Sequence, residues 1–355
     1  MNIGIMTFHW AINHGALLQT YALQHALTDL FADANVEIID YWPEKYRKTL
    51  IRSFKSKNIK VIQRNLKDLK KQKKLIPFRN KIPTTHRYYS QQQLIQENMN
   101  YDVIIAGSDQ IWNQSFTMNG EGCKTAAYYL PFCNSAVKLS YAASFGCMTL
   151  EDKTIEFITP LLKRFDAISV RENSGKDILS RIGIDATVVC DPSVLLPVSS
   201  YHQLSKHNEN EDFIALYLLH LVDYNQKKEI NRAFPGQKIK DIEMSTEEEW
   251  IGSIADASFL VTNSYHGMMV ALKMHTPFAV VLSSGVLTGM NDRFYTILER
   301  IGLMNRVITK ENQLSYIYNS PIEWDSVDEE LQRYAEESKQ FLLNHCLIVK
   351  ENSDL

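Results

Sequence analysis

The run with the most functional side chains in this sequence is Thr262-Asn263-Ser264-Tyr265-His266-Gly267. It follows the apolar residues Phe259–Val261 and opens a predicted helix. In α/β sheets, ligands bind at the carboxyl ends of strands, and a helix N-terminus attracts phosphate or carboxylate. His266 can exchange a proton near neutral pH, and Gly267 lets a ligand approach the backbone. An equally weighted interpretation is a helix N-cap followed by a packed histidine.

A second polar run, Gly107-Ser108-Asp109-Gln110-Ile111-Trp112-Asn113, follows the apolar residues 101–106. Glycine permits a sharp exit from a strand, and four polar side chains then stand at the strand end. Trp112 could stack on the face of a sugar ring. On this run alone, a turn in which Asp109 caps the next element is favoured by about two to one.

Two arginines stand near other element ends. Arg171 follows a predicted strand over 167–170, and Arg293 lies at the start of a late helix. A guanidinium can hold a carboxylate or phosphate through two parallel hydrogen bonds. Arg171 could equally pair with Glu172 or Asp191 as part of the structure.

Several other kinds of site are not indicated. The loop after the first strand contains Asn13 and His14 but no GxGxxG, the fingerprint of dinucleotide binding. The five cysteines form no CxxC pair and have no histidine at zinc-ligand spacing, so we expect reduced thiols and no metal. No window reaches the roughly 18 apolar residues that span a bilayer, and the N-terminus lacks a secretory n-region. We therefore expect a cytoplasmic protein.

The motifs require a framework of alternating strands and helices. Strands of the first half are predicted at residues 2–6, 36–40, 101–106, 137–143, 167–170 and 186–190. Four further strand–helix pairs are predicted over 213–302, and the alternation indicates an α/β fold. The polar segment 197–212 is the candidate linker between domains 1–196 and 213–325, and a C-terminal helix occupies 326–355. Two such halves predict a ligand cleft between them.

The formal net charge of −3 argues against a dedicated nucleic-acid binder, but the charge is unevenly distributed. Residues 44–81 contain 15 Lys or Arg against two acidic residues, so this segment carries +13 and the rest of the chain −16. A narrow apolar stripe runs along it through Ile59, Ile62, Leu66 and Leu69. Two interpretations carry equal weight. The segment is a solvated helical insertion whose stripe packs on the first domain, or it is attracted to an anionic membrane surface.

Taken in order, these runs resemble the polysaccharide pyruvyl transferase family. The matching segments are NHGALLQTYAL (13–23), GSDQIWN (107–113), YAASFG (141–146), SVRE (169–172), DPSVLL (191–196), SYHGM (264–268) and NDR (291–293). The resemblance implies two Rossmann-like domains facing a cleft, similar to the GT-B fold. It also implies an enzyme of bacterial capsule or exopolysaccharide assembly that uses phosphoenolpyruvate to place a pyruvate ketal on a sugar. Phosphoenolpyruvate is then a co-substrate, with no further cofactor, and the acceptor is a sugar that a polyprenyl diphosphate can carry.

The resemblance also suggests residue roles. We expect His266 to act as the acid/base catalyst and Asp109 as the base nearest the acceptor. The expected donor-binding residues are Arg171, Ser264, Gly267 and Arg293, and the expected acceptor-binding residues are Asn13, His14, Trp112 and Asn113. Some members of the family carry an arginine where this chain has Ser264, so Arg171 or Arg293 would supply that cation. A GT-B-type glycosyltransferase using a nucleotide-sugar and a non-catalytic polysaccharide-assembly protein stay open as alternatives.

Overall fold

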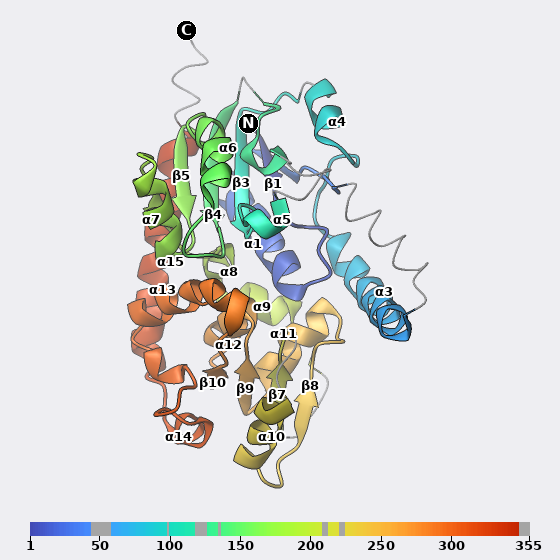
Figure 1. Ribbon diagram of the computed structural model, residues 1–355, viewed down its shortest axis with the longest axis vertical. Helices are drawn as coiled ribbons and strands as arrows, with labels where there is room; N and C mark the ends of the chain where they lie inside the picture. The colour runs from blue at the N-terminus through green and yellow to red at the C-terminus, as the bar shows by residue number, and fades with distance from the viewer. Residues whose placement is uncertain are drawn as a thin grey trace. The chain divides into compact units, whose positions relative to one another are not determined.

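The computed structural model describes residues 1–43, 58–97, 99–117, 126–133, 136–207, 212–219 and 224–347. The chain divides into two compact units. Unit 1 comprises Met1–Leu195 and Tyr334–Leu355, and unit 2 comprises Leu196–Arg333. Each unit contains one parallel sheet with helices between its strands (Figure 1), so the predicted α/β fold class is confirmed.

Unit 1 contains a six-stranded parallel sheet in the order β2-β1-β3-β4-β5-β6. Its strands are β1 (Asn2–Met6), β2 (Asn35–Ile38), β3 (Val103–Asp109), β4 (Val137–Ala143), β5 (Ala167–Val170) and β6 (Thr187–Val188). The central strands are almost entirely buried, as expected for a parallel sheet with both faces covered. Strand β3 runs three residues past its predicted end, because Asp109 still pairs with Ala143 of β4.

Helices pack along this sheet toward both of its edge strands, β2 and β6. Those of unit 1 are α1 (His14–Leu30), α3 (Ile59–Arg79), α4 (Gln91–Gln96), α5 (Gln114–Thr117), η1 (Ala127–Tyr129), α6 (Asp152–Leu162), α7 (Asn173–Arg181) and α8 (Pro192–Leu195). Helix α1 contacts β2 and β3, whereas α7 contacts β5 and β6. In Figure 1 they are the dark blue helix and the leftmost green helix of this unit.

The C-terminal helix α15 (Trp324–Cys346) begins two residues before the predicted start at residue 326. Its residues from Tyr334 onward belong to unit 1. There the backbone N–H of Cys190 donates to Ser338 Oγ at 2.9 Å, which ties this half of the helix to the end of β6. Residues 348–355 of the predicted helix lie outside the described residues.

The basic segment 44–81 is described from residue 58 onward, and residues 44–57 lie outside the described part. Helix α3 forms most of it, and Asn58 caps its start. The beginning of the apolar stripe is exposed, with Ile59 at 70% and Leu66 at 50%. Near the other end Phe78 is buried, and its ring lies 5.3 Å from that of Tyr21 on α1. Helix α3 therefore packs on unit 1 through Phe78, beyond the stripe, whereas Ile59, Ile62 and Leu66 of the stripe are exposed.

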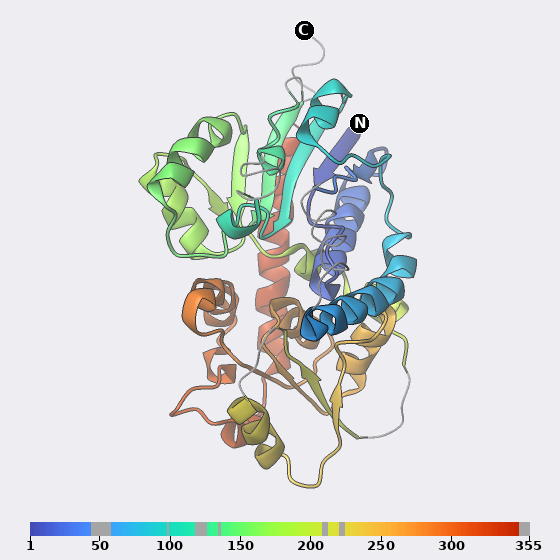
Figure 2. The same cartoon turned by 45° about the vertical axis from the view of Figure 1, so that its right-hand side comes forward.

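Unit 2 contains a four-stranded parallel sheet in the order β10-β9-β7-β8. Its strands are β7 (Ile214–Tyr217), β8 (Ile239–Asp241), β9 (Phe259–Thr262) and β10 (Phe278–Val280). Its helices are α9 (Val198–Leu204), α10 (Tyr224–Ala233), α11 (Glu247–Asp256), α12 (Tyr265–Lys273), η2 (Gly285–Asn291), α13 (Asp292–Arg300), η3 (Met304–Arg306) and α14 (Leu314–Asn319). Helices α10 and α14 pack together, as do α11 and α12, and the two pairs lie on different sides of the strands (Figures 1 and 2).

The predicted linker 197–212 contains helix α9 and belongs to unit 2. Its later part packs on α11, where the backbone N–H of Lys206 donates to the oxygen of Glu248 at 3.0 Å. A Cβ atom on Gly252 would lie 2.2 Å from the backbone oxygen of Lys206, so glycine is needed for this close approach. Residues 208–211 lie outside the described part.

Among the helices of the described residues, none is both long enough and apolar enough to cross a membrane.

Candidate functional site

The carboxyl ends of β1 and β3 in unit 1 meet in a buried polar network. The Thr7 hydroxyl donates to the backbone oxygen of Ser108 at 3.0 Å. The Gln19 amide donates to Thr7 Oγ1 at 3.0 Å, and its oxygen accepts from the Ser108 hydroxyl at 2.8 Å. All three side chains are fully buried, so the polar atoms satisfy one another. This network fixes the backbone from which the next residue, Asp109, projects.

Gly107 is the residue that lets β3 and β4 approach here. Its φ is 136°, and a Cβ atom would lie 2.0 Å from the backbone oxygen of Tyr141. Asp109 also has a positive φ, 75°, a conformation that aspartate tolerates better than most residues. Its Oδ1 accepts from the backbone N–H of Gln110 at 2.8 Å. The polar run therefore forms a turn that holds a partly exposed carboxylate at the sheet edge.

One buried guanidinium faces three carboxylates beside this turn. The side chain of Arg171 is 0% exposed, and its Nη1 lies 2.8 Å from Asp191 Oδ2. Its Nη2 lies 3.6 Å from Asp109 Oδ1, and its Nε lies 3.7 Å from Glu172 Oε2. The Glu172 carboxylate also accepts from the backbone N–H of Phe145 at 3.0 Å. The pairing that was the structural alternative for Arg171 is thus present, and it joins Arg171 to the predicted base Asp109.

Two of the predicted acceptor residues pack inside unit 1. Trp112 is fully buried, its Nε1 donates to the backbone oxygen of Tyr128 at 3.1 Å, and its ring stacks on Tyr129 with 4° between the planes. The Asn113 amide donates to Gln110 Oε1 at 2.8 Å and is 7% exposed overall. Because both faces of the Trp112 ring are covered, stacking on a sugar would require this side chain to move.

The other two predicted acceptor residues begin helix α1. The side-chain oxygen of Asn13 caps the helix by accepting from the backbone N–H of Ala16 at 3.2 Å. His14 is fully buried. Of the four predicted acceptor residues, Asn13 is the one with partial exposure.

Sequence reasoning missed a buried histidine–carboxylate pair at the ends of β1 and β2. The Nε2 atom of His9 lies 2.8 Å from Asp40 Oδ1, and Arg87 Nε donates to Asp40 Oδ2 at 3.0 Å. Burial alone would raise the pKa of the Asp40 carboxyl, but His9 and Arg87 outweigh it and hold that pKa below its ordinary value. The available signal was a carboxylate at the last position of the predicted strand 36–40, but nothing in the spacing linked it to His9.

In unit 2, the SYHG run forms the start of helix α12. Ser264 is the N-cap, and its Oγ accepts from the backbone N–H of Gly267 at 3.2 Å. His266 is the second residue of the helix and is 5% exposed. Its ring lies edge-on to that of Tyr265, with centroids 5.4 Å apart. The N-cap and the packed histidine are therefore both present, at a helix start that carries a partial positive charge.

Close packing accounts for the glycine and the asparagine of this run. A Cβ atom on Gly267 would lie 3.0 Å from Thr262 Oγ1 and 3.1 Å from Tyr217 Cδ1, so glycine lets α12 approach β7 and β9. The Asn263 side chain brackets Leu219, accepting from its N–H and donating to its oxygen, both at 2.6 Å. This bracket fixes the chain as it leaves β7.

Arg293 lies beside the same helix start. Its guanidinium carbon is 5.7 Å from the ring centroid of Tyr265 and 5.5 Å from that of Phe294. The neighbouring Asn291 brackets Ser283, donating to its oxygen and accepting from its N–H, both at 2.9 Å. The NDR and SYHG runs, some 25 residues apart, are therefore joined through one tyrosine ring.

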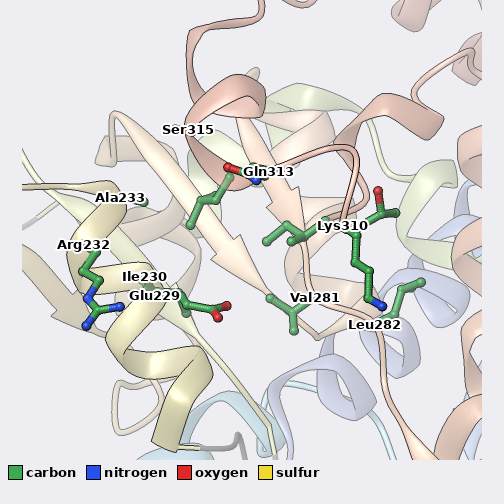
Figure 3. A pocket seen from close by; sticks show the side chains of 12 residues that line it. Glu229, Ile230, Arg232, Ala233, Val281, Leu282, Lys310, Gln313 and Ser315 are labelled. Atoms are coloured by element: carbon green, nitrogen blue, oxygen red, sulfur yellow. The ribbon is translucent and has the colours of Figure 1, made fainter.

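A cavity of about 740 Å³ adjoins the carboxyl end of β10 in unit 2. In Figure 3, Glu229 from α10 and Lys310 lie on opposite sides of Val281, which directly follows the strand. Ile230, Leu282, Ile308 and Leu314 add apolar walls. None of the predicted donor residues lines this cavity, and sequence reasoning did not find it because its polar residues come from segments without a motif.

The described residues contain no group of three His, Cys, Asp or Glu that could hold a metal ion. Of the predicted donor residues, Arg171 belongs to unit 1, and the other three belong to unit 2.

The family model of the polysaccharide pyruvyl transferases matches residues 13–285. Comparison with curated proteins finds no match. Among solved structures, the chain is similar to the glycotransferase of kitacinnamycin, with 9% identity, coverage of 97% of this chain and 98% of that chain, and a TM-score of 0.47. It is also similar to an α-glucosyltransferase bound to UDP-glucose and abasic DNA (10% identity, 100% and 98% coverage, TM-score 0.45). A third is the E. coli heptosyltransferase WaaC (11% identity, 94% and 99% coverage, TM-score 0.38).

Proposed function

This chain belongs to the polysaccharide pyruvyl transferase family, and we propose that it transfers pyruvate from phosphoenolpyruvate to a sugar. The product is a pyruvate ketal on a sugar of a bacterial capsular polysaccharide or exopolysaccharide, or of its lipid-linked precursor. Phosphoenolpyruvate serves as co-substrate, and the reaction needs no other cofactor.

The observation that carries the proposal is the start of α12. It combines a helix N-terminus, His266 in the first turn, and Arg293 held over the neighbouring ring of Tyr265. Phosphoenolpyruvate carries a carboxylate and a phosphate, and both attract a guanidinium and a helix N-terminus. We assign donor binding to Arg293, Ser264 and Gly267, and proton transfer to His266.

The reaction balances with one general acid and one base. The acid protonates the methylene carbon of phosphoenolpyruvate, which makes C2 cationic, and one sugar hydroxyl adds to C2 as it loses its proton. The C2–O bond to phosphate then breaks, and the second hydroxyl adds and closes the ketal. Of the two hydroxyl protons, one replaces the proton given to the methylene carbon, and the other leaves on phosphate. His266 supplies the acid in this scheme, and groups that stabilise the developing charge lower the barrier.

Unit 1 contributes the acceptor side in this proposal. Asp109 is partly exposed, with 15% of its side chain open to solvent, and Arg171 stabilises its carboxylate. A carboxylate in this setting can accept the proton of a sugar hydroxyl, so Asp109 keeps the role of base. Arg171 acts as a positioning residue, since its own guanidinium is fully buried. Asn13, at the start of α1, is the remaining predicted acceptor residue with partial exposure.

We propose further that helix α3 brings the enzyme to an anionic membrane surface in the cytoplasm. The helix carries eight Lys or Arg and one acidic residue, and its apolar residues Ile59, Ile62 and Leu66 are exposed. Each basic residue near an anionic surface contributes about 1 kcal/mol, and exposed apolar side chains add burial energy in the interface. This location suits an acceptor carried on a polyprenyl diphosphate.

A nucleotide-sugar glycosyltransferase is the second candidate, and the cavity beside β10 favours it. Its volume of about 740 Å³ and its mixed apolar and charged walls suit a ligand larger than phosphoenolpyruvate. Thermal stabilisation of the protein by a nucleotide-sugar, without stabilisation by phosphoenolpyruvate, would identify this activity.

The direct test of the proposal is phosphate release from phosphoenolpyruvate. The purified full chain is incubated with free and lipid-linked galactosides, glucosides and mannosides, each with and without phosphoenolpyruvate. We expect acceptor-dependent phosphate release with one of these sugars. Absence of release with every acceptor, together with turnover of a nucleotide-sugar, would overturn the proposal.

A further inference from the structure

A second hollow, in unit 1, lies at the opposite edge of the sheet from the strand ends described above. It surrounds Asn2 and Asn35, the first residues of β1 and β2, and reaches Asn100 just before β3. Its volume is about 530 Å³, within the range of small-ligand sites. Because all these strands run parallel, their amino ends meet at this edge, away from the carboxyl ends that carry Asp109.

Two buried phenols line this hollow. Tyr88 is 3% exposed and Tyr101 is 8% exposed. The hydroxyl of Tyr101 donates to Glu37 Oε1 at 2.9 Å. Burial, together with the charges of Glu97 and Glu37, raises the pKa of Tyr88 to about 12, so its hydroxyl stays protonated and can donate. Tyr88 lines the hollow, although the residue as a whole is almost wholly buried.

The charge around the hollow decides which ligands fit. Two carboxylates line it, Glu37 and Glu97, and His86 lies 3.5 Å from Glu97. Among the described lining residues none is Lys or Arg. Phosphate and carboxylate groups are therefore repelled, whereas amide, carboxylate and phenol groups together match the donors and acceptors of sugar hydroxyls.

We propose that this hollow binds an uncharged segment of a glycan, with Tyr88 donating to a ring or hydroxyl oxygen and Asn35 and Asn100 pairing with hydroxyl groups. The inference rests on the proposed function in taking a glycan as the ligand class. The hollow then holds sugar units other than the one that reacts, so that a longer acceptor binds more tightly than a short one.

The test measures binding without phosphoenolpyruvate. Neutral tetrasaccharides of glucose, galactose and mannose are titrated into the full chain and followed by saturation-transfer NMR. The variants are Tyr88→Phe, which removes one hydroxyl from the lining, and Asn100→Ala at the rim. Tyr316→Phe is the matched control, because this tyrosine is 66% exposed in unit 2. We expect one tetrasaccharide to bind, each hollow variant to weaken binding about fivefold, and the control to bind like the natural chain.

Equal binding by all variants, or no binding of any tetrasaccharide, would overturn the inference. Saturation of the same residues by Mg²⁺ or spermidine, without glycan binding, would assign the hollow to cations and also overturn it. Glycan binding that depends on Tyr88 in a chain that releases no phosphate from phosphoenolpyruvate would leave this site standing while the proposed function fails.

Discussion

Arg171 in unit 1 and Arg293 in unit 2 both stand near the carboxyl ends of parallel strands, but their surroundings differ. Arg171 is fully buried, and Asp191, Glu172 and Asp109 face its three guanidinium nitrogens. Arg293 is half-buried and lies over the rings of Tyr265 and Phe294. A buried guanidinium surrounded by carboxylates holds a structure together, whereas the Arg293 guanidinium lies against aromatic rings beside the start of α12. The same residue type thus has different surroundings in the two units, and the proposed function gives Arg171 a positioning role and Arg293 a donor-binding role.

The largest expected effect is a loss of catalytic activity, and it comes from a residue of unit 2. His266→Ala should lower transfer from phosphoenolpyruvate on the order of 10²–10⁴-fold, the usual contribution of a general acid, because the variant has no group to protonate the methylene carbon. The variant should stay folded because the N-cap Ser264 remains, while losing about 0.5–3 kcal/mol of unfolding free energy because the His266 ring is buried against Tyr265. Steady-state kinetics and urea unfolding measure the two quantities.

The matched control for this variant is His275→Ala, whose histidine is exposed and pairs with Asp328 in the same unit. It should transfer at the rate of the natural chain. Full activity of His266→Ala would remove this residue from the mechanism.

Arg171→Met should instead act on stability. Removing one partner of a buried ion pair leaves its carboxylates without compensation and costs about 3–5 kcal/mol. Arg293→Met should cost less, about 0.5–2 kcal/mol, the range of cation–π contacts from exposed to desolvated sites, while raising the KM for phosphoenolpyruvate. Chemical unfolding of both variants measures the difference. A loss below about 1 kcal/mol for Arg171→Met would contradict the structural role.

The sequence predicted the strands and the positions of both arginines, but not all of the partners that surround Arg171. Strand β1 and strand β4 have their predicted bounds, because short apolar runs between polar turns define them. The position of Arg171 after a strand was also clear. Glu172 and Asp191 were also named as its candidate partners, but the contact with Asp109, about 60 residues earlier in the chain, was missed because no local pattern reports it. The same reason hid the partners of His9.

Trp112 shows the limit of reasoning from residue type. An aromatic ring in a polar run suggests sugar stacking. In the structure, however, Tyr129 stacks on this ring, and the indole N–H donates to the backbone oxygen of Tyr128. Element type follows from periodicity, whereas the exposure of one side chain depends on segments that the chain brings together later.

A smaller effect concerns the His9–Asp40 pair. The folded-state pKa of Asp40 lies below its unfolded value of about 3.9. Its stabilisation is therefore complete above about pH 4 and is lost as the pH falls toward the folded pKa. Asp40→Asn should lower the free energy of unfolding by about 1.5–3 kcal/mol at pH 7, and this difference should shrink as the pH falls below about 4.

Urea unfolding at a series of pH values checks this dependence, with the exposed Asp33→Asn as the control. A difference between Asp40→Asn and the natural chain that stays constant with pH would contradict the ionised pairing.

A further expected effect concerns helix α3. Replacing Ile59 and Leu66 by serine should weaken co-sedimentation with vesicles containing anionic lipid, because each buried apolar side chain contributes about 1.5–3 kcal/mol at most and the basic residues remain. Unfolding should be unaffected, since both side chains are exposed. Vesicles without anionic lipid serve as the control. Vesicle binding that is the same with and without anionic lipid, and the same in the variant and the natural chain, would contradict the membrane proposal.

Pyruvyl transfer from phosphoenolpyruvate is tested by following the carbon atoms of the donor. The natural chain is incubated with phosphoenolpyruvate labelled with ¹³C in all three carbons and with the best acceptor from the sugar panel, and the acceptor is analysed by NMR and mass spectrometry. We expect a labelled ketal carbon bonded to two sugar oxygens, with one phosphate released per ketal formed. An acceptor that gains a sugar from a nucleotide-sugar, and no label from phosphoenolpyruvate, would contradict this expectation.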